Sequence, residues 1–161
     1  MRYLSGTEEE NAVHYLLMAA SVALDSKCLR SKCGSLIVQD GEVIGKGFNS
    51  PPQNRTLEFC LKDFLPKDFP SDKTCCIHAE QRAVANALVL NAEKLAGSTL
   101  YFVRLDETGR IAKAGKPYCT ICSKLALDAE IDYWVLWHEK GLCIYDAYEY
   151  NEISFGRKEW H

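Results

Sequence analysis

The sequence lacks any apolar stretch of the roughly 20 residues that a helix needs to cross a lipid bilayer. It also lacks the apolar core of a secretory signal, because Met1 is followed within a few positions by polar and acidic residues. Internal repeats and low-complexity runs are missing as well. We therefore expect a cytoplasmic protein with no membrane partner.

The chain has no excess of positive charge. Its formal net charge is −3 and its sequence pI is about 5.8. Proteins that bind duplex nucleic acids usually carry a basic footprint, so a nucleic acid is an unexpected partner. A small anionic substrate needs only one local cationic pocket and is compatible with this balance. The 161 residues, 47% of them hydrophobic, are enough for a single domain (1–161) with an adequate core.

Proline is scarce, and four of the five prolines lie between residues 49 and 74, where we expect an irregular segment. A loop of this length in a compact domain is usually functional or locally anchored. Cysteine, in contrast, is abundant, with eight residues. In a secreted chain they would suggest a disulfide scaffold, but without a secretory signal free thiols and zinc ligands are the better interpretation.

The remaining patterns predict alternating helices and strands. Thr7, followed by three glutamates, has the pattern of a capping box, and Asp40-Gly41 is a tight-turn signal between two apolar runs. The expected elements are helices at 7–25, 75–91 and 119–129 and strands at 34–39, 42–48, 98–104 and 131–137, with a polar loop at 105–116. This order predicts an α/β protein, a layered α-β-α sandwich with a central mixed sheet of four to five strands.

The tail from His138 is aromatic and acidic. Its aromatic residues are Tyr145, Tyr148, Tyr150, Phe155 and Trp160. We expect a packing segment that covers the edge of the sheet, and a substrate-facing or oligomer-facing role is the alternative.

The most informative pattern joins His78 and Glu80 to Cys119 and Cys122, with Pro117 just before the cysteines. One histidine and two cysteines are three good zinc ligands and leave a fourth position for water, as in catalytic zinc sites. Cys119 and Cys122 are three residues apart, so they share one face of a helix, which can begin at Pro117. Glu80 can lie beside the metal without being a ligand, and such a carboxylate can shuttle protons for zinc-activated water. The pattern therefore predicts a catalytic zinc site with Glu80 as its acid–base group.

Each half of this pattern has a plainer interpretation. A lone C-x-x-C is also typical of a redox pair or of half a structural zinc site, and a lone H-x-E is common by chance. A redox protein that uses Cys119 and Cys122 would need neither His78 nor Glu80. The combination, at two predicted helix starts whose dipoles favour thiolates, favours the catalytic zinc centre.

Most of the chain resembles the cytidine and deoxycytidylate deaminase superfamily, whose zinc-dependent base deaminases share the H-x-E and P-C-x-x-C signature. The stretches that carry the resemblance are 26–30 (SKCLR), 34–38 (GSLIV), 45–52 (GKGFNSPP) and 76–80 (CIHAE). The first half is most similar to deoxycytidylate (dCMP) deaminases. The resemblance implies that His78, Cys119 and Cys122 hold Zn²⁺, that Glu80 carries protons, and that Asn49 and Ala79 contact the substrate.

Three residues depart from the pattern of that branch. Tyr118 separates Pro117 from Cys119, Arg82 stands where the branch often has asparagine, and Ser50 replaces a common glycine. These changes leave the zinc chemistry intact and affect the choice of substrate and any regulation by nucleotides.

The resemblance also implies a possible second, structural zinc. Cys28 matches a ligand of such a site in some dCMP deaminases, and Cys60 and Cys75 are the further candidates, with Cys33 and Cys76 also available. The alternative is that these cysteines are small buried hydrophobic residues or free thiols.

The expected activity is hydrolytic deamination of a cytosine nucleotide, most simply dCMP to dUMP and ammonia. Arg30, Arg55 and Lys62 are candidate phosphate contacts. Alternatives are a deaminase of tRNA adenosine or of another nucleobase or nucleoside, and a non-catalytic zinc-binding partner subunit, which would not need to keep Glu80. A homo-oligomer is expected from the resemblance.

Overall fold

The computed structural model describes residues 1–66, 68 and 75–156. In chain order, the strands are β1 (Arg2–Tyr3), β2 (Lys32–Gln39), β3 (Glu42–Phe48), β4 (Thr99–Leu105), β5 (Ile111–Ala112), β6 (Tyr133–His138) and β7 (Gly141–Asp146). The α-helices are α1 (Gly6–Ala23), α2 (Ala79–Leu90), α3 (Thr120–Asp128) and α4 (Ala147–Ser154). Short 3₁₀ helices are η1 (Pro52–Asn54), η2 (Leu61–Phe64) and η3 (Ala92–Lys94).

The strands form one mixed sheet in the order β1-β7-β6-β4-β2-β3, and β5 pairs with β4. β4 and β6 are parallel, and the other pairs are antiparallel. Five strands are long and two have only two residues, which confirms the predicted mixed sheet. Its fifth long strand, β7, comes from the aromatic tail.

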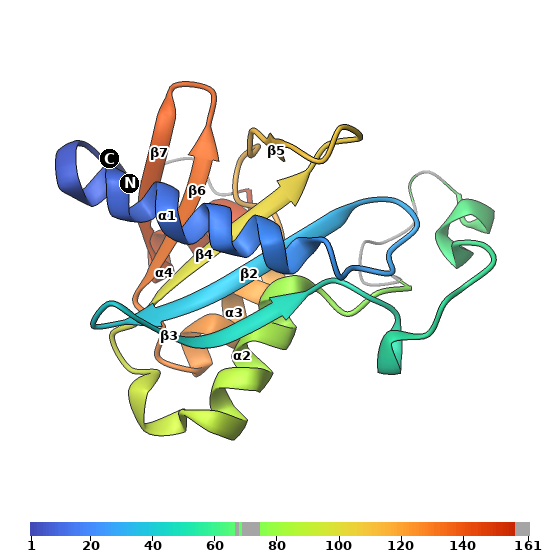
Figure 1. The fold of residues 1–161 in the computed structure, drawn as a ribbon, viewed down its shortest axis with the longest axis horizontal. Coiled ribbons are helices and arrows are strands. Elements are labelled where there is room, and N and C mark those ends of the chain that lie inside the picture. Colours follow the sequence, from blue (N-terminus) through green and yellow to red (C-terminus); the bar gives the residue numbers. More distant parts are fainter. Residues whose placement is uncertain (67, 69–74, 157–161) are drawn as a thin grey trace.

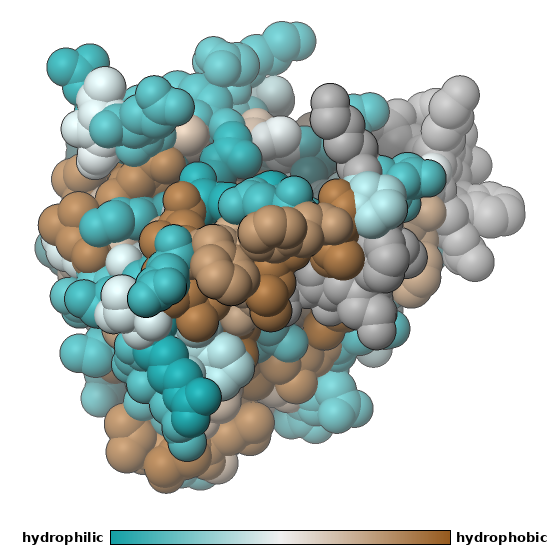
Figure 2. Space-filling model, turned by 90° about the vertical axis from the view of Figure 1, so that its right-hand side faces the viewer, coloured by the Kyte–Doolittle hydropathy of each residue, from teal (hydrophilic) through white to brown (hydrophobic). Residues whose placement is uncertain are grey.

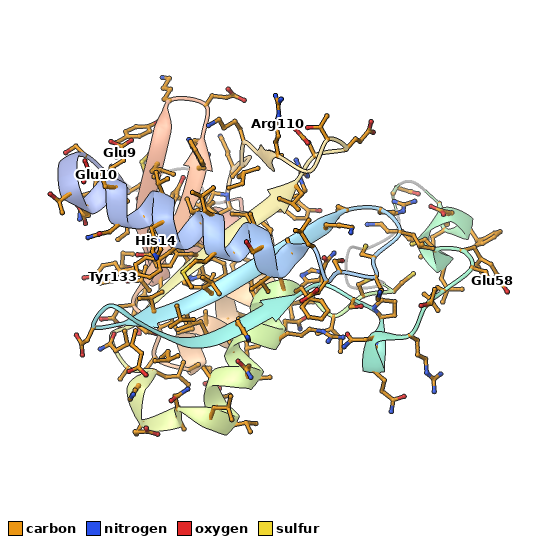
Figure 3. All side chains as sticks on the ribbon, in the orientation of Figure 1. Glu9, Glu10, His14, Glu58, Arg110 and Tyr133 are labelled. Carbon is orange, nitrogen blue, oxygen red and sulfur yellow. The ribbon has the colours of Figure 1, made fainter. Side chains whose placement is uncertain are left out.

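Helices cover both faces of this sheet (Figure 1). α1 lies on one face, whereas α2, α3 and α4 lie on the other. Apolar side chains fill both interfaces, and charged groups such as Glu9, Glu10 and Glu58 point outward (Figure 3). The layered α-β-α sandwich is therefore confirmed. None of the helices in the described residues has the length and hydropathy to cross a membrane.

The predicted hairpin forms as expected. Asp40 and Gly41 have φ angles of 51° and 80°, the left-handed conformation that a two-residue hairpin turn requires. The turn joins β2 to β3, and β3 becomes the edge strand against which α2 packs.

Three helix starts differ from the prediction. α1 begins at Gly6 after Ser5, so Thr7 does not cap it. α2 begins at Ala79 rather than at residue 75, because Ile77 forms a β-bridge with Ser50. α3 begins at Thr120 with Cys119 as its N-cap, so Pro117 precedes the helix instead of opening it.

The tail does not simply cover the edge of the sheet, because part of it is a strand between β1 and β6. It forms β7 and then α4, whose N-cap Asp146 accepts hydrogen bonds from the backbone N–H groups of Tyr148 and Glu149. Tyr145 and Tyr150 are buried, whereas Tyr148 and Phe155 are exposed. Trp160 lies outside the described residues.

Candidate active site

The starts of α2 and α3 bring three metal-ligand atoms together. His78 Nδ1 lies 3.3 Å from Cys122 Sγ and 3.4 Å from Cys119 Sγ, and the two sulfurs are 3.3 Å apart. Within the part of the chain that the structure describes, this is the one cluster of three or more His, Cys, Asp or Glu side chains compact enough to hold a metal. One nitrogen and two sulfurs suit zinc.

The local sequence explains this convergence. His78 is the N-cap of α2, and its backbone N–H donates to the side chain of Gln81 at 3.0 Å. Cys119 is the N-cap of α3, and Cys122 follows within the first turn of that helix. The pKa of Cys119 is lowered to about 4 by hydrogen bonds with Cys122 and His78. The thiolate, which is the form that binds metals, is therefore favoured at one helix N-terminus.

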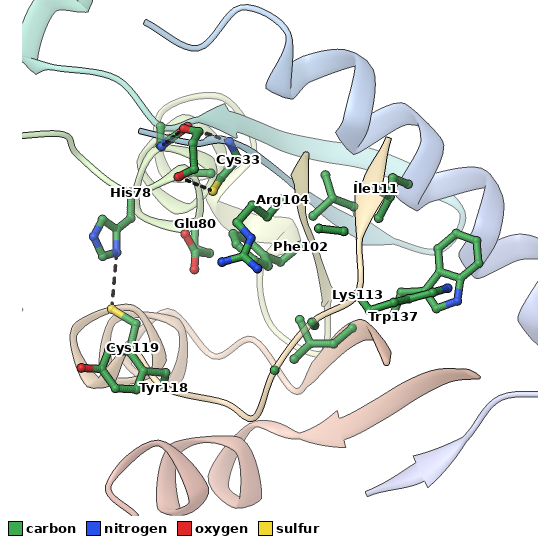
Figure 4. A pocket seen from close by; sticks show the side chains of 18 of the residues that line it. Cys33, His78, Glu80, Phe102, Arg104, Ile111, Lys113, Tyr118, Cys119 and Trp137 are labelled. Carbon is green, nitrogen blue, oxygen red and sulfur yellow. Dashed lines mark hydrogen bonds between the residues drawn. The ribbon is translucent and has the colours of Figure 1, made fainter. Parts of the chain in front are cut away.

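Glu80 lies beside this cluster in the first turn of α2. Its side chain is buried, with 6% of its surface exposed, and burial raises the pKa of its carboxyl above the usual range. A carboxyl with a raised pKa is suited to take up and release a proton near neutral pH. Figure 4 shows His78 and Cys119 facing each other, with Glu80 between them and the pocket interior.

The cluster opens into a pocket of about 580 Å³, a volume that suits a small-molecule ligand. Asn49 and Ala79 line this pocket together with His78, Glu80 and Cys119, so the predicted substrate contacts and zinc ligands are gathered there. Cys122 lies just behind them, fully buried.

Asn49 is held firmly by its surroundings. Its Oδ1 accepts hydrogen bonds from the Cys33 backbone N–H at 2.7 Å and from the Ser26 hydroxyl at 2.8 Å. Its Nδ2 donates to the Ser31 carbonyl at 2.9 Å. The orientation of the amide is therefore set before any ligand arrives, which lowers the entropy cost of binding.

The three predicted phosphate contacts lie outside the pocket. Arg30 is exposed and pairs with Asp63, Arg55 is exposed, and Lys62 lies in η2. The cationic residues that line the pocket are Arg104, Lys113 and Lys116. Arg104 comes from β4, whereas Lys113 and Lys116 come from the segment predicted as a polar loop. That segment returns to the sheet through the pairing of β5 with β4, which the sequence pattern does not reveal.

Aromatic side chains complete the walls. Phe102 and Trp137 line the pocket, and the Lys113 ammonium lies 3.7 Å from the centre of the Trp137 ring. Tyr150 also lines it and stacks on Trp134, with ring centres 4.0 Å apart. One residue of the tail therefore lines the pocket, and its contact with a substrate stays a prediction.

The cysteines of the predicted second zinc site lie in two pairs. The sulfurs of Cys60 and Cys75 are 3.3 Å apart. Cys28 and Cys76 form the second pair, in which burial and the hydrogen bond with Cys28 raise the pKa of the Cys76 thiol to about 12. Cys33 is separate and lines the main pocket.

Comparison with known proteins agrees with this site. Residues 8–138 match the model of the cytidine and deoxycytidylate deaminase zinc-binding region. The chain belongs to this family. A deoxycytidylate deaminase of Mycobacterium phage D29 is 35% identical over 99 residues, which cover 56% of this chain and 75% of the phage protein. A deoxycytidylate deaminase of Saccharomyces cerevisiae is 32% identical over 79 residues, covering 46% of this chain and only 25% of the yeast protein.

Solved structures of the family share the fold. The dCMP deaminase of cyanophage S-TIM5 in complex with dCMP and dUMP aligns with a TM-score of 0.57 and 22% identity, over 80% of this chain and 82% of the phage chain. A cytidine deaminase from Burkholderia pseudomallei gives 0.56 and 16%, over 86% and 94%. The resemblance seen in the sequence is thus confirmed at the level of family and fold.

Proposed function

We propose that residues 1–161 form a single zinc-dependent deaminase domain that hydrolyses dCMP to dUMP and ammonia. The observation that carries this proposal is the buried carboxyl of Glu80 beside three converging metal donors, inside a pocket of nucleotide size. A non-catalytic partner subunit would not require a buried carboxyl at this position, and a redox pair would not require His78.

Each residue has a distinct role in this proposal. His78, Cys119 and Cys122 would hold zinc, which when bound lowers the pKa of water so that water becomes a nucleophile near neutral pH. Glu80 would accept a proton from the attacking water and deliver it to the ring nitrogen of the base. It would then carry a second proton, from the hydroxyl that the added water leaves on the ring carbon, to the departing amino group, which leaves as ammonia. Ala79 and Asn49 contact the base and sugar, and the amide of Asn49, already fixed in orientation, strengthens binding of the substrate.

A nucleotide is favoured over an uncharged nucleoside by the cations of the pocket. Arg104, Lys113 and Lys116 lie on its wall, and a phosphate there gains charge-assisted hydrogen bonds. The two relatives described above are deoxycytidylate deaminases, and the similar phage structure holds dCMP and dUMP. We therefore assign dCMP as the substrate and move the phosphate contact from Arg30, Arg55 and Lys62 to these three residues.

A substrate panel tests this assignment directly. Zinc-loaded protein is incubated with dCMP, CMP, deoxycytidine, cytosine, adenosine and a tRNA anticodon stem, and ammonia release is measured. We expect dCMP to give the highest kcat/KM. Deamination of the tRNA or of an unphosphorylated base, with dCMP inert, would overturn the assignment of dCMP as the substrate but would not contradict the zinc-dependent reaction.

Self-association and location complete the proposal. The face drawn in Figure 2 carries a band of hydrophobic surface, and exposed apolar residues of the 49–66 segment include Phe59, Leu61 and Phe64. Exposed apolar surface of this kind is typical of protein interfaces, so we expect a homo-oligomer, to be measured by light scattering. None of the eight cysteines, all of which lie in the described residues, is in a disulfide, which suits the reducing cytoplasm.

A second, structural zinc remains part of the proposal. Cys60 pairs with Cys75, and Cys28 pairs with Cys76. Cys75 and Cys76 both lie just before His78 in the sequence. Binding of zinc would draw these pairs into one tetrahedral site and anchor the irregular segment.

A further inference from the structure

Arg82 makes an unusual set of contacts for a residue so close to the zinc cluster. It lies on α2 one turn after His78, and its backbone N–H donates to the His78 carbonyl at 3.2 Å. Its guanidinium donates to Asn54 Oδ1 at 2.7 Å, to the Pro51 carbonyl at 3.0 Å and to the Ser50 carbonyl at 3.3 Å. One side chain therefore binds three residues of the segment that follows β3.

The same guanidinium packs against the end of β3. Its central carbon lies 5.5 Å from the centre of the Phe48 ring, a cation–π contact that adds to the hydrogen bonds. Arg82 thus spans the chain from residue 48 to residue 54, and these residues flank Asn49. The asparagine that the family branch often has at this position is too short to reach three acceptors at once.

The bound segment needs such support. Gln53 and Asn54 have φ angles of 58° and 57°, a left-handed conformation that asparagine tolerates but that costs Gln53 of order 1 kcal/mol or more. The segment's backbone hydrogen bonds are the Ser50–Ile77 bridge, at 3.0 and 3.2 Å, and two within and after η1, at 2.9 and 3.3 Å. These backbone bonds do not join η1 to α2, and the Arg82 side chain supplies that link.

The bridge also links this segment to the metal site. Ile77 directly precedes His78, and Ser50 directly follows Asn49. The Ser50 carbonyl accepts from both the Ile77 N–H and Arg82. Arg82 therefore belongs to a ring of contacts that joins the residue after Asn49 to the residue before His78.

We propose that Arg82 is a positioning residue that fixes Asn49 at the pocket wall by clamping residues 50–54, and so sets the affinity for the substrate without touching it. This inference rests on the proposed function, because it takes Asn49 as a substrate contact. It predicts that Arg82 acts on KM through Asn49, whereas kcat and metal binding depend on residues that Arg82 leaves in place.

The principal test compares Arg82→Ala with Arg55→Ala, an exposed arginine of the same segment outside the pocket. For dCMP we expect Arg82→Ala to raise KM about tenfold, the factor typical for loss of charge-assisted hydrogen bonds. We expect kcat within about threefold of wild type, an unchanged zinc content and an unchanged Arg55→Ala control. An unchanged KM in Arg82→Ala would overturn the proposal.

Two further variants separate positioning from simple charge. Arg82→Lys keeps the charge but loses the fork that binds several acceptors, so its KM should stay close to that of Arg82→Ala. If lysine restores the KM, the effect is electrostatic and the clamp is wrong. In the Asn49→Ala background, Arg82→Ala should raise KM little further. A KM increase in the double variant equal to the product of the two single-variant increases would contradict action through Asn49.

The remaining outcomes are also decided. If Arg82→Ala does not fold, Asn54→Ala removes one acceptor alone and should raise KM about two- to threefold, since one hydrogen bond is lost. An unchanged KM in Asn54→Ala would overturn the clamp.

If wild-type protein does not deaminate dCMP, the proposed function fails, and hydrogen exchange then tests the clamp without substrate. Faster exchange of the amides of Asn49, Ser50 and Asn54 in Arg82→Lys supports it, and unchanged exchange refutes it.

Discussion

Gly47 lies so close to Ala79 that a Cβ atom on Gly47 would come within 2.3 Å of the Ala79 carbonyl oxygen. The same atom would lie 2.4 Å from the Ala83 backbone nitrogen. The missing side chain therefore allows β3 to lie directly against the first turn of α2, which carries His78 and Glu80. Close packing of this strand and helix sets the position of the zinc helix.

Gly47→Ala is expected to destabilise the protein and to displace this helix. Overpacking typically costs about 1–3 kcal/mol of unfolding free energy, and here the opposing atoms are backbone and cannot rotate away. The free energy of unfolding should fall by at least that amount in urea titrations, and kcat should fall with it. Gly115→Ala is the matched control for stability, since a Cβ there meets nothing within 4 Å. Equal stability of the two variants would contradict the packing argument.

Glu80→Gln should nearly abolish turnover while zinc stays bound. Glutamine keeps the size and the hydrogen-bonding capacity of the side chain but cannot accept and release the proton, and general acid–base catalysis contributes on the order of 10²–10⁴-fold. Steady-state rates with dCMP, together with metal analysis of the same sample, check this. More than about a tenth of the wild-type rate would mean that Glu80 is not the proton carrier.

Local patterns were enough to predict the convergence of His78, Cys119 and Cys122 and most of the sheet. The spacing of Cys119 and Cys122 and the position of His78 at a helix start depend on neighbours a few residues apart, so the sequence reveals them. The start of α2 was misplaced by four residues because Ile77 pairs with Ser50, which is distant in sequence. Helix propensity contains no information about such a bridge.

The cations that line the pocket could not be predicted for the same reason. Arg30 and Arg55 are near the recognised motifs in sequence, but Arg30 pairs with Asp63 and Arg55 points to solvent. Arg104 lies on β4, which pairs with β2 and β6, and Lys116 follows β5, which folds back on β4. Long-range pairing, rather than local composition, determines which charges line the pocket.

Removal of the pocket cations should weaken binding of dCMP selectively. We expect Arg104→Ala and Lys116→Ala each to raise KM for dCMP by about tenfold, because a charge-assisted hydrogen bond to phosphate is lost. The KM for deoxycytidine, which has no phosphate, should stay nearly constant. Arg30→Ala serves as the control outside the pocket. Equal effects on both substrates would show that these residues do not contact the phosphate.

The thiol of Cys33 should be unreactive at neutral pH although it lines the pocket. Burial, followed by the nearby charge of Glu80, raises the pKa of this thiol from 9.0 to about 12. The reactive thiolate is thus rare at pH 7 and increases about tenfold per pH unit until the pH approaches that value. Alkylation by iodoacetamide, followed by mass spectrometry of the Cys33 peptide, measures this. Rapid labelling at pH 7 would contradict the raised pKa.

Metal content separates the catalytic zinc from the proposed structural one. Protein purified without chelator should hold about two zinc ions per chain if Cys28, Cys60 and Cys75 bind the second. Cys28→Ser should then lower the count by one with little change in kcat, because its pair lies outside the pocket, whereas Cys119→Ser should abolish activity. Chelation should remove activity and zinc together, and added zinc should restore both. A count of one in wild type and in Cys28→Ser would show that the two thiol pairs do not bind metal. Active protein without metal would refute the catalytic site itself.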